Sequence, residues 1–229
     1  MIAAPAFNGQ VTIPFAISLA ETFALLRENG IDVTFRISHS GSLLVLERNR
    51  LMHMFLESDC THLLCIDVDI GWSARHVMGM IAHDKELVAG VYPNRTNGKF
   101  YFRPILKEDQ SVVLGDNNLL KMEGIPAGFM LLKKSVLQKI IEKFPNDYFN
   151  SFDSEEHATK CYAFFNILLE NNNMWGEDYY FCRLCTASGV DIWVDANIKL
   201  WHGGSVGCLA AHMGDSPEDP TKKEFVCLQ

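Results

Sequence analysis

Long hydrophobic runs, clustered basic residues and an even set of cysteines are all missing from this sequence. No apolar stretch approaches the roughly 20 residues of a membrane-spanning helix, and residues 1–5 lack the basic region and apolar length of a signal peptide. The seven cysteines are scattered through apolar segments, which suits a reducing compartment better than a disulfide framework. We therefore expect a cytoplasmic protein without a membrane span.

Basic charge is scarce as well. Lys and Arg together number 20 against 28 Asp and Glu, which gives a formal net charge of −8. Nucleic-acid binding depends on clustered Lys and Arg, so this balance argues against a nucleic-acid partner. Hydrophobic residues make up 48% of the chain and can fill a substantial core. The sequence predicts one domain over residues 1–205 and a flexible tail, with Gly, Ser and Pro, over 206–229.

The first 92 residues alternate between strand-like and helix-like segments. Strands are predicted over residues 1–4, 32–38, 61–66 and 86–92, with helices over 13–28, 42–57 and 73–83 between them. Apolar residues recur at helical spacing in the first helix, at Ile13, Ile17, Ala20 and Ala24. This βαβαβ order is typical of an α/β fold with a Rossmann-like, mainly parallel sheet.

The pattern changes after residue 92. Short alternating pieces with turn signals over 93–121 indicate an antiparallel excursion. Helices are predicted over 135–144 and 176–188, strands over 191–194 and 197–201, and a polar surface loop over 146–160.

Two carboxylates stand where a parallel sheet binds its ligands. Ligands bind beyond the carboxyl ends of the strands, and Asp67 and Asp69 directly follow the apolar strand 61–66. Oxygen ligands suit Mg²⁺ or Mn²⁺, and such an ion can hold a diphosphate against acidic side chains. An isolated Asp-x-Asp pair is equally explained by chance or by loop capping.

Three further residues are candidates for the same cleft. Arg48 lies in the apolar stripe of its helix and needs an anionic partner, either as a buried ion pair with a sheet carboxylate or to neutralise Asp67 or reach a nucleotide. Asp178 begins a helix whose inward face is apolar, so it either points into the cleft or only caps the helix dipole. His202 follows a strand and is either structural or a third metal ligand, in which case a nitrogen ligand favours Mn²⁺.

Taken in order, these motifs resemble those of family-2-like GT-A glycosyltransferases. The segment Thr-His-Leu-Leu-Cys-Ile-Asp-Val-Asp at 61–69 is similar to the strand and DxD motif of that family. Pro5-Ala6-Phe7-Asn8 resembles the loop that cups the nucleotide base, and Arg48-Asn49 resembles the Arg-Asn pair of the helix before the DxD strand. Trp175-Gly176-Glu177-Asp178 resembles the acceptor-side Glu-Asp motif, and His202 the late histidine of the metal site. The resemblance spans residues 1–205. By the same resemblance, the protein is similar to compact single-domain transferases of phages and large DNA viruses. A viral protein of this kind would be found in the host cytoplasm.

The resemblance implies a GT-A, or nucleotide-diphospho-sugar transferase, fold with a nucleotide-sugar-binding half over 1–92 and an acceptor half over 93–205. It implies an enzyme of the EC 2.4 class that moves a sugar, from a UDP-sugar by preference, to a hydroxyl of a glycan or other acceptor. The donor would contact Pro5, Phe7, Asn8, Arg48, Asn49, Asp67, Val68 and Asp69. The metal ligands would be Asp67, Asp69 and His202. In inverting members of the family an acid at the position of Asp178 takes the proton of the acceptor hydroxyl, and Glu177 would bind an acceptor hydroxyl.

Three alternatives stay open. A sugar-phosphate nucleotidyltransferase would share the fold class, but it is expected to carry a Gly-rich, basic loop after the first strand, and Ala6 to Gln10 contains one Gly and no base. A metal-dependent phosphatase of the haloacid-dehalogenase kind would carry its Asp-x-Asp on the first strand. A non-catalytic nucleotide- or glycan-binding module is opposed only by Asp178 and His202. Arg183-Leu-Cys-Thr lacks the family's helix motif for processive synthesis, which favours single transfers.

Overall fold

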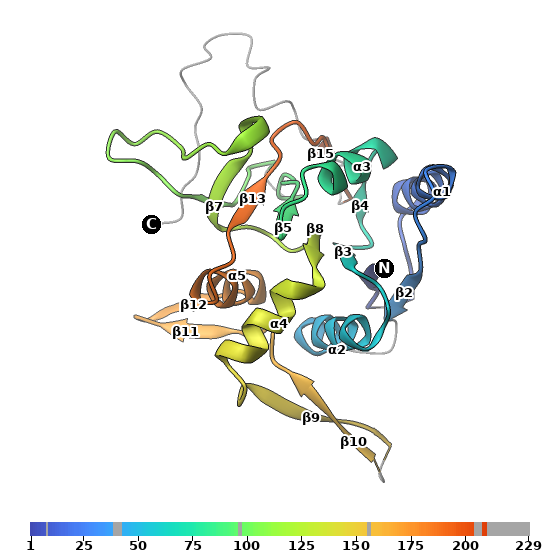
Figure 1. The fold of residues 1–229 in the computed structure, drawn as a ribbon, viewed down its shortest axis with the longest axis vertical. Helices are drawn as coiled ribbons and strands as arrows, with labels where there is room; N and C mark the ends of the chain where they lie inside the picture. Colours follow the sequence, from blue (N-terminus) through green and yellow to red (C-terminus); the bar gives the residue numbers. More distant parts are fainter. Residues whose placement is uncertain (8, 39–42, 96–97, 155–156, 204–207, 210–229) are drawn as a thin grey trace.

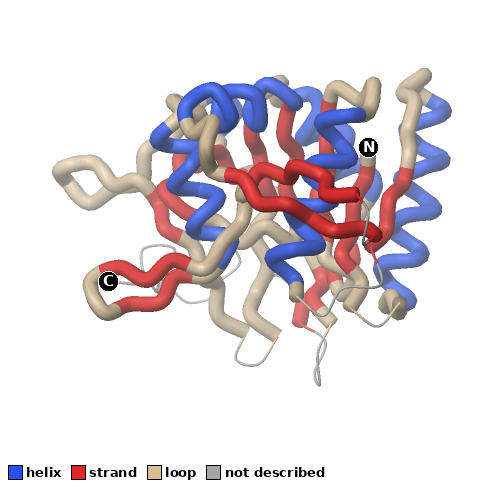
Figure 2. The backbone as a smooth tube through the Cα atoms, turned by 90° about the horizontal axis from the view of Figure 1, so that it is seen from below, coloured by secondary structure: helices blue, strands red, loops and turns tan. Residues whose placement is uncertain are grey.

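The chain folds around one central sheet with helices on both faces (Figures 1 and 2). A computed structural model describes residues 1–7, 9–38, 43–95, 98–154, 157–203 and 208–209. The sheet has eight strands in the spatial order β2-β1-β3-β8-β5-β13-β7-β6. Their bounds are β1 Ile2–Pro5, β2 Phe35–Ser38, β3 His62–Ile66, β5 Leu87–Ala89, β6 Arg103–Pro104, β7 Leu120–Gly124, β8 Phe129–Lys133 and β13 Ile192–Val194.

Most strands of this sheet run in one direction. β1 is parallel to β2 and β3, and β13 is parallel to β5. β8 lies antiparallel between β3 and β5, and β7 lies antiparallel between β13 and β6. The predicted α/β fold, with a mainly parallel sheet and an antiparallel excursion, is confirmed.

Two hydrophobic clusters cover the two faces of the sheet. One packs against α2 (Leu44–Glu57), α4 (Lys134–Lys143) and α5 (Glu177–Ala187), and the other against α1 (Ile13–Glu28) and α3 (Ala74–Ala82). In β3, Leu63 and Cys65 belong to the first cluster, and Leu64 and Ile66 to the second. The strand is apolar at every position after His62 because both of its faces are buried. The five cysteines whose side chains the structure describes are free thiols.

Helix α1 has the predicted bounds but buries an unexpected face. Ile13 and Ile17, two of the apolar positions that predicted the helix, are 77% and 54% exposed, whereas Ser18 and Thr22 are buried. Trp72 explains this, because its backbone N–H donates to Ser18 Oγ (2.9 Å) and its indole N–H donates to Thr22 Oγ1 (2.8 Å). Paired hydroxyls can be buried at little cost.

The segment 146–160, predicted as a surface loop, is mostly strand. β9 (Tyr148–Ser154) and β10 (His157–Tyr162) form an antiparallel hairpin, and β11 (Leu168–Glu170) and β12 (Asn173–Trp175) form a second one. Both hairpins project from the body of the protein beside α4 and α5 (Figure 1). A short 3₁₀ helix, η1, covers Asp116–Asn118.

A small three-stranded sheet contains the last residues that the structure describes. It pairs β4 (Ile70–Gly71), β14 (Trp201–His202) and β15 (Cys208–Leu209). The strand predicted over 197–201 is thus found at Trp201–His202 instead, and β15 falls within the segment predicted as a tail. The rest of the tail predicted over 206–229 lies outside the described residues. None of the described helices combines the length and apolarity needed to cross a bilayer.

Candidate active site

A cavity of about 640 Å³ opens at the carboxyl ends of β1 and β3. The loop after β1, the start of α2, the turn after β3, the segment after β5 and β14 all contribute to its wall. The lining residues are Pro5, Ala6, Phe7, Leu44, Glu47, Asp67, Val68, Asp69, Tyr92, Asn94, Arg95 and His202. Five of the predicted donor contacts are therefore in one wall, namely Pro5, Phe7, Asp67, Val68 and Asp69. Asn8, a sixth, lies outside the described residues.

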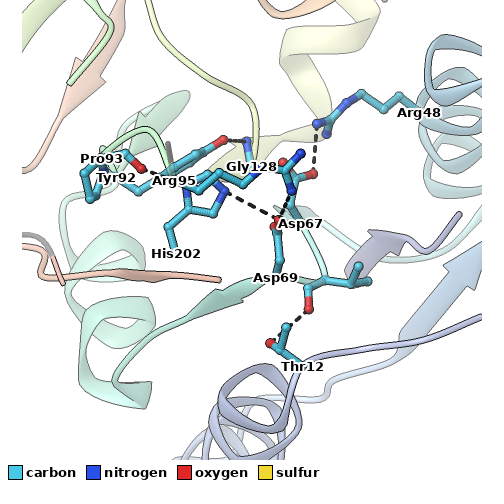
Figure 3. A network of polar contacts seen from close by, with 10 residues as sticks. Thr12, Arg48, Asp67, Asp69, Tyr92, Pro93, Arg95, Gly128 and His202 are labelled. Carbon is cyan, nitrogen blue, oxygen red and sulfur yellow. Dashed lines mark hydrogen bonds and ion pairs between the residues drawn. The ribbon is translucent and has the colours of Figure 1, made fainter. Parts of the chain in front are cut away.

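Asp67 is fixed by contacts from two other elements (Figure 3). Its backbone N–H donates to the Gly128 carbonyl (2.9 Å), and its Oδ1 accepts from Arg48 Nη2 (2.8 Å). Gly128 N–H in turn donates to the Tyr92 hydroxyl (3.0 Å). A Cβ at residue 128 would overlap both that hydroxyl and Asp67 Oδ2. Glycine is therefore required here to let the backbone approach the carboxylate.

Arg48 forms the ion pair that its position in the sequence required. Its side chain is only 5% exposed, and its Nε lies 3.5 Å from Glu177 Oε1. The guanidinium also lies 5.7 Å from the centre of the Phe165 ring. Burial opposes the charge, but Asp67, Asp178 and Glu177 outweigh it and hold the pKa of Arg48 above its ordinary value. Arg48 therefore stays charged and joins the carboxylate after β3 to the carboxylates of α5.

Asn49, predicted to contact the donor, is not among the residues that line the cavity. It is 1% exposed, and its side-chain amide donates to the Phe165 carbonyl and accepts from the Phe165 N–H, both at 2.9 Å. The Phe165 ring stacks on Phe181 of α5, with centroids 4.9 Å apart. Asn49 thus ties α2 to the segment that follows β10. Its place beside Arg48 in the sequence did not reveal this, because side chains of consecutive helical residues point in different directions.

Strand pairing brings His202 to Asp69. β14 pairs with β4 so that His202 is opposite Ile70, and Gly203 N–H donates to the Asp69 carbonyl (2.7 Å). His202 Nε2 then lies 3.5 Å from Asp69 Oδ2, and Arg95 Nη1 lies 3.0 Å from the same oxygen. Burial opposes ionisation of Asp69, but His202 and Arg95 outweigh it and hold the pKa of Asp69 below its ordinary value.

The ring of His202 is held in one orientation. Its Nδ1 lies 2.7 Å from the Pro93 carbonyl, and its ring packs edge-on against Tyr92 with centroids 4.9 Å apart. A carbonyl oxygen only accepts, so Nδ1 carries a proton, and in the neutral ring Nε2 presents a lone pair to Asp69. Burial disfavours the charged ring, but Asp69 and the Pro93 carbonyl raise the pKa of His202 above its ordinary value.

The side chains predicted as metal ligands are of the types that bind divalent cations, although the structure does not arrange them as a complete metal-binding site. Within the described residues, no group of three or more His, Cys, Asp and Glu side chains is placed to hold an ion. Asp67 and Asp69 are each paired with an arginine instead. However, the lone pair of His202 facing Asp69 at 3.5 Å is matched to a cation, because two ligands at about 2.1 Å from one ion lie roughly 3 to 3.5 Å apart. The backbone carbonyl behind His202 is also the usual partner of a metal-binding imidazole.

Asp178 lies in the first turn of α5, close enough to Arg48 for the two charges to interact. Its Oδ1 is shielded from solvent and has no hydrogen-bond partner among the described residues, although the residue as a whole is half-buried. Burial raises the pKa of Asp178 to about 7, with Glu177 and Asp67 adding to the shift, and Arg48 and the Ala127 N–H opposing it. A carboxylate with a free oxygen and a pKa near neutrality can accept a proton in this setting.

Sequence reasoning missed Tyr92, Asn94, Arg95 and Glu47, which all line the cavity. Tyr92 and the residues after it could have been found, because they follow the strand at 86–92 and its carboxyl end meets the same edge as that of β3. Glu47 gave no such signal. It is 4% exposed and its partner is Arg50 (2.9 Å), an ordinary helical pair in sequence.

Comparison with known proteins shows likeness in fold only. No protein-family model matches the chain, and no curated protein is significantly similar to it in sequence. Among solved structures, A197 from STIV matches with a TM-score of 0.52 and 18% identity over 89% of this chain and 85% of that one. A 4-diphosphocytidyl-2C-methyl-D-erythritol synthase from Anaerococcus prevotii matches with a TM-score of 0.35 and 12% identity, over 66% of this chain and 78% of that one. A glycosyltransferase involved in glycosylation of the major capsid of PBCV-1 matches with a TM-score of 0.32 and 14% identity, over 64% and 66%. The first match shows a shared fold, whereas TM-scores as low as the other two support no argument.

Proposed function

We propose that this chain is a metal-dependent glycosyltransferase. It moves a sugar from a nucleoside-diphosphate sugar, for which UDP is the first choice, to a hydroxyl of a glycan or another acceptor, with inversion. The observation that carries this proposal is the pair of ion pairs that joins Asp67 through buried Arg48 to Glu177, with Asp178 close enough to interact with the charge of Arg48. It joins a cavity of nucleotide size to a shielded carboxylate with a free oxygen.

The donor would lie in the cavity after β1 and β3. Phe7 is 73% exposed there and offers its ring to a base, with Pro5 and Val68 in the same wall. Asp67, Asp69 and His202 would hold Mn²⁺ or Mg²⁺. The bound ion would neutralise the charge of the departing nucleoside diphosphate.

Asp178 would act as the base. Its free Oδ1 can take the proton of an acceptor hydroxyl that attacks the anomeric carbon, and the attack from the opposite side inverts that carbon. A pKa of about 7 keeps a large fraction of Asp178 ionised at neutral pH, while still making it a better base than an ordinary aspartate. Glu177, held near Arg48, would bind a hydroxyl of the acceptor.

Calorimetry of nucleotide binding tests the donor site. UDP and GDP are titrated with and without Mn²⁺ into the wild type, into Asp69→Ala, and into Asp116→Ala as a control, because Asp116 is 86% exposed and does not line the cavity. We expect metal-dependent binding that Asp69→Ala abolishes and Asp116→Ala preserves. A wild type that binds neither nucleotide in the presence of Mn²⁺ overturns the proposal.

Product analysis tests the reaction. Candidate UDP-sugars are incubated with Mn²⁺, and release of UDP and the anomeric configuration of the product are followed by NMR. We expect UDP release and an inverted product. Formation of a nucleotide sugar from a nucleoside triphosphate and a sugar 1-phosphate would instead identify a nucleotidyltransferase.

A further inference from the structure

The two arginines that pair with the Asp-x-Asp carboxylates differ in how firmly they are held. Arg48 is 5% exposed and contacts Asp67, Glu177 and the Phe165 ring. The side chain of Arg95 is 60% exposed, and its ion-pair partner is Asp69. Exposed ion pairs are weak and are screened by salt, whereas a buried arginine with several partners is fixed. Arg95 can therefore leave its carboxylate, and Arg48 cannot.

Arg95 also pairs with one particular oxygen of Asp69. Its Nη1 lies 3.0 Å from Asp69 Oδ2, which is the oxygen that faces His202 Nε2 at 3.5 Å. A cation held by Asp69 and His202 needs the same oxygen. The guanidinium and a divalent cation are thus alternative partners of Oδ2.

The segment that carries Arg95 is built into the site. Tyr92 accepts a hydrogen bond from Gly128, and the Pro93 carbonyl orients His202. Next to Arg95, Asn94 N–H donates to the Lys99 carbonyl (2.8 Å) and the Asn94 carbonyl accepts from Gly98 N–H (2.8 Å). The backbone on either side of Arg95 is therefore anchored, while its side chain extends along the cavity wall (Figure 3).

We propose that Arg95 is an exchangeable ligand of the site, pairing with Asp69 in the empty protein and with the phosphates of the donor once a divalent cation has taken Asp69. The proposal rests on the proposed function and deepens it. A guanidinium released beside a diphosphate is well suited to bind it, since Arg matches the geometry of phosphate oxygens. The cation and the nucleoside diphosphate then bind cooperatively, because each favours the same position of Arg95.

The test measures binding rather than activity. Binding of Mn²⁺ alone is followed by the EPR signal of the free ion, and binding of UDP and GDP with saturating Mn²⁺ is followed by calorimetry, in the wild type, Arg95→Ala and Arg95→Lys. Arg183→Ala is the matched control, because it removes a similarly exposed arginine, 52% accessible and paired with Glu170, away from the cavity.

Opposite effects on the two ligands are expected from Arg95→Ala. Mn²⁺ alone should bind about twofold to fivefold more tightly, since a weak competitor is gone, while the nucleotide should bind roughly tenfold or more weakly, since a charged hydrogen bond is lost. Arg95→Lys should recover part of the nucleotide affinity, and Arg183→Ala should match the wild type. Weaker binding of Mn²⁺ alone by Arg95→Ala, or unchanged affinity for both ligands, overturns the proposal. A wild type that binds Mn²⁺ but no nucleotide refutes the proposed function instead, and the Mn²⁺ comparison still decides whether Arg95 competes for Asp69.

Discussion

Replacing Asp178 by Asn should stabilise the fold at alkaline pH while abolishing sugar transfer. The folded pKa of Asp178, about 7, lies above its ordinary value of 3.8. A carboxyl whose pKa is higher in the folded protein than in the unfolded one contributes its full stability at pH values below the unfolded pKa. This contribution is lost as the pH rises toward the folded pKa. The loss therefore develops between about pH 4 and pH 7 and is complete above that range.

The magnitude follows from the shift. A difference of about 3 pKa units, at about 1.4 kcal/mol for each, corresponds to about 4 kcal/mol as an upper limit. Coupling to Glu177 and Asp67 spreads part of this over several groups, so we expect about 2 to 4 kcal/mol at pH 8. Asn resembles the protonated acid in shape, and its carbonyl oxygen can keep the hydrogen bond from the Ala127 N–H.

Urea unfolding followed by circular dichroism at pH 4, 6 and 8, without metal or nucleotide, measures the effect. Asp178→Asn should equal the wild type near pH 4 and exceed it increasingly toward pH 8. Asp116→Asn, which alters an exposed carboxylate, should follow the wild type throughout. If Asp178→Asn is no more stable than the wild type at pH 8, Arg48 fully compensates the buried charge, and the argument for a raised pKa is wrong.

Three other perturbations test the structure around the cavity. Asn49→Ala leaves the buried N–H and carbonyl of Phe165 without partners and should lower the free energy of unfolding by about 2 to 4 kcal/mol, measured by urea unfolding. Gly128→Ala places a Cβ against the Tyr92 hydroxyl and should weaken Mn²⁺-dependent nucleotide binding in calorimetry, and unchanged binding would contradict the close approach. Because His202 has a raised pKa and must lose its proton to bind a cation, Mn²⁺ affinity should fall as the pH drops through that pKa, and His202→Gln should both weaken the affinity and flatten its pH dependence.

Local signals in the sequence were sufficient to predict much of the structure of residues 1–92. Helix α1 begins after Thr12, whose Oγ1 accepts the Phe15 N–H (3.3 Å), and the chain leaves it through Gly30 at φ +70°. Each of these is a local preference of one or two residues, so the predicted bounds 13–28 coincide with the structure. Asp67 and Asp69 were placed correctly after the carboxyl end of β3 for a similar reason, since the short apolar run before them is typical of a buried strand.

The structure after residue 92 depends more on contacts between residues that are distant in sequence. The β9–β10 hairpin was predicted as a loop because its sequence is largely polar. In the structure, Tyr148 and Tyr162 pair across the hairpin and Lys160 Nζ lies 4.0 and 4.9 Å from the centres of their rings. Cross-strand contacts of this kind stabilise a sheet without leaving a periodic pattern in either strand.

The charges that meet at the candidate site explain why a cation should be obligatory for the donor. Four carboxylates and two arginines lie along the line from the cavity to α5, namely Asp67, Asp69, Glu177, Asp178, Arg48 and Arg95. With every carboxyl ionised and His202 neutral, four negative charges less two positive ones leave −2, and a nucleoside diphosphate adds more negative charge. The arginines are already balanced by Asp67 and Asp69, so they cannot offset the donor unless a divalent cation takes over a carboxylate. Nucleotide affinity should therefore rise steeply with Mn²⁺ concentration and be lost in EDTA, and salt should screen only the share of the affinity that exposed Arg95 contributes. A cavity that bound phosphate through arginines alone would do the reverse, with tight binding in EDTA and a steep loss of affinity as salt is added.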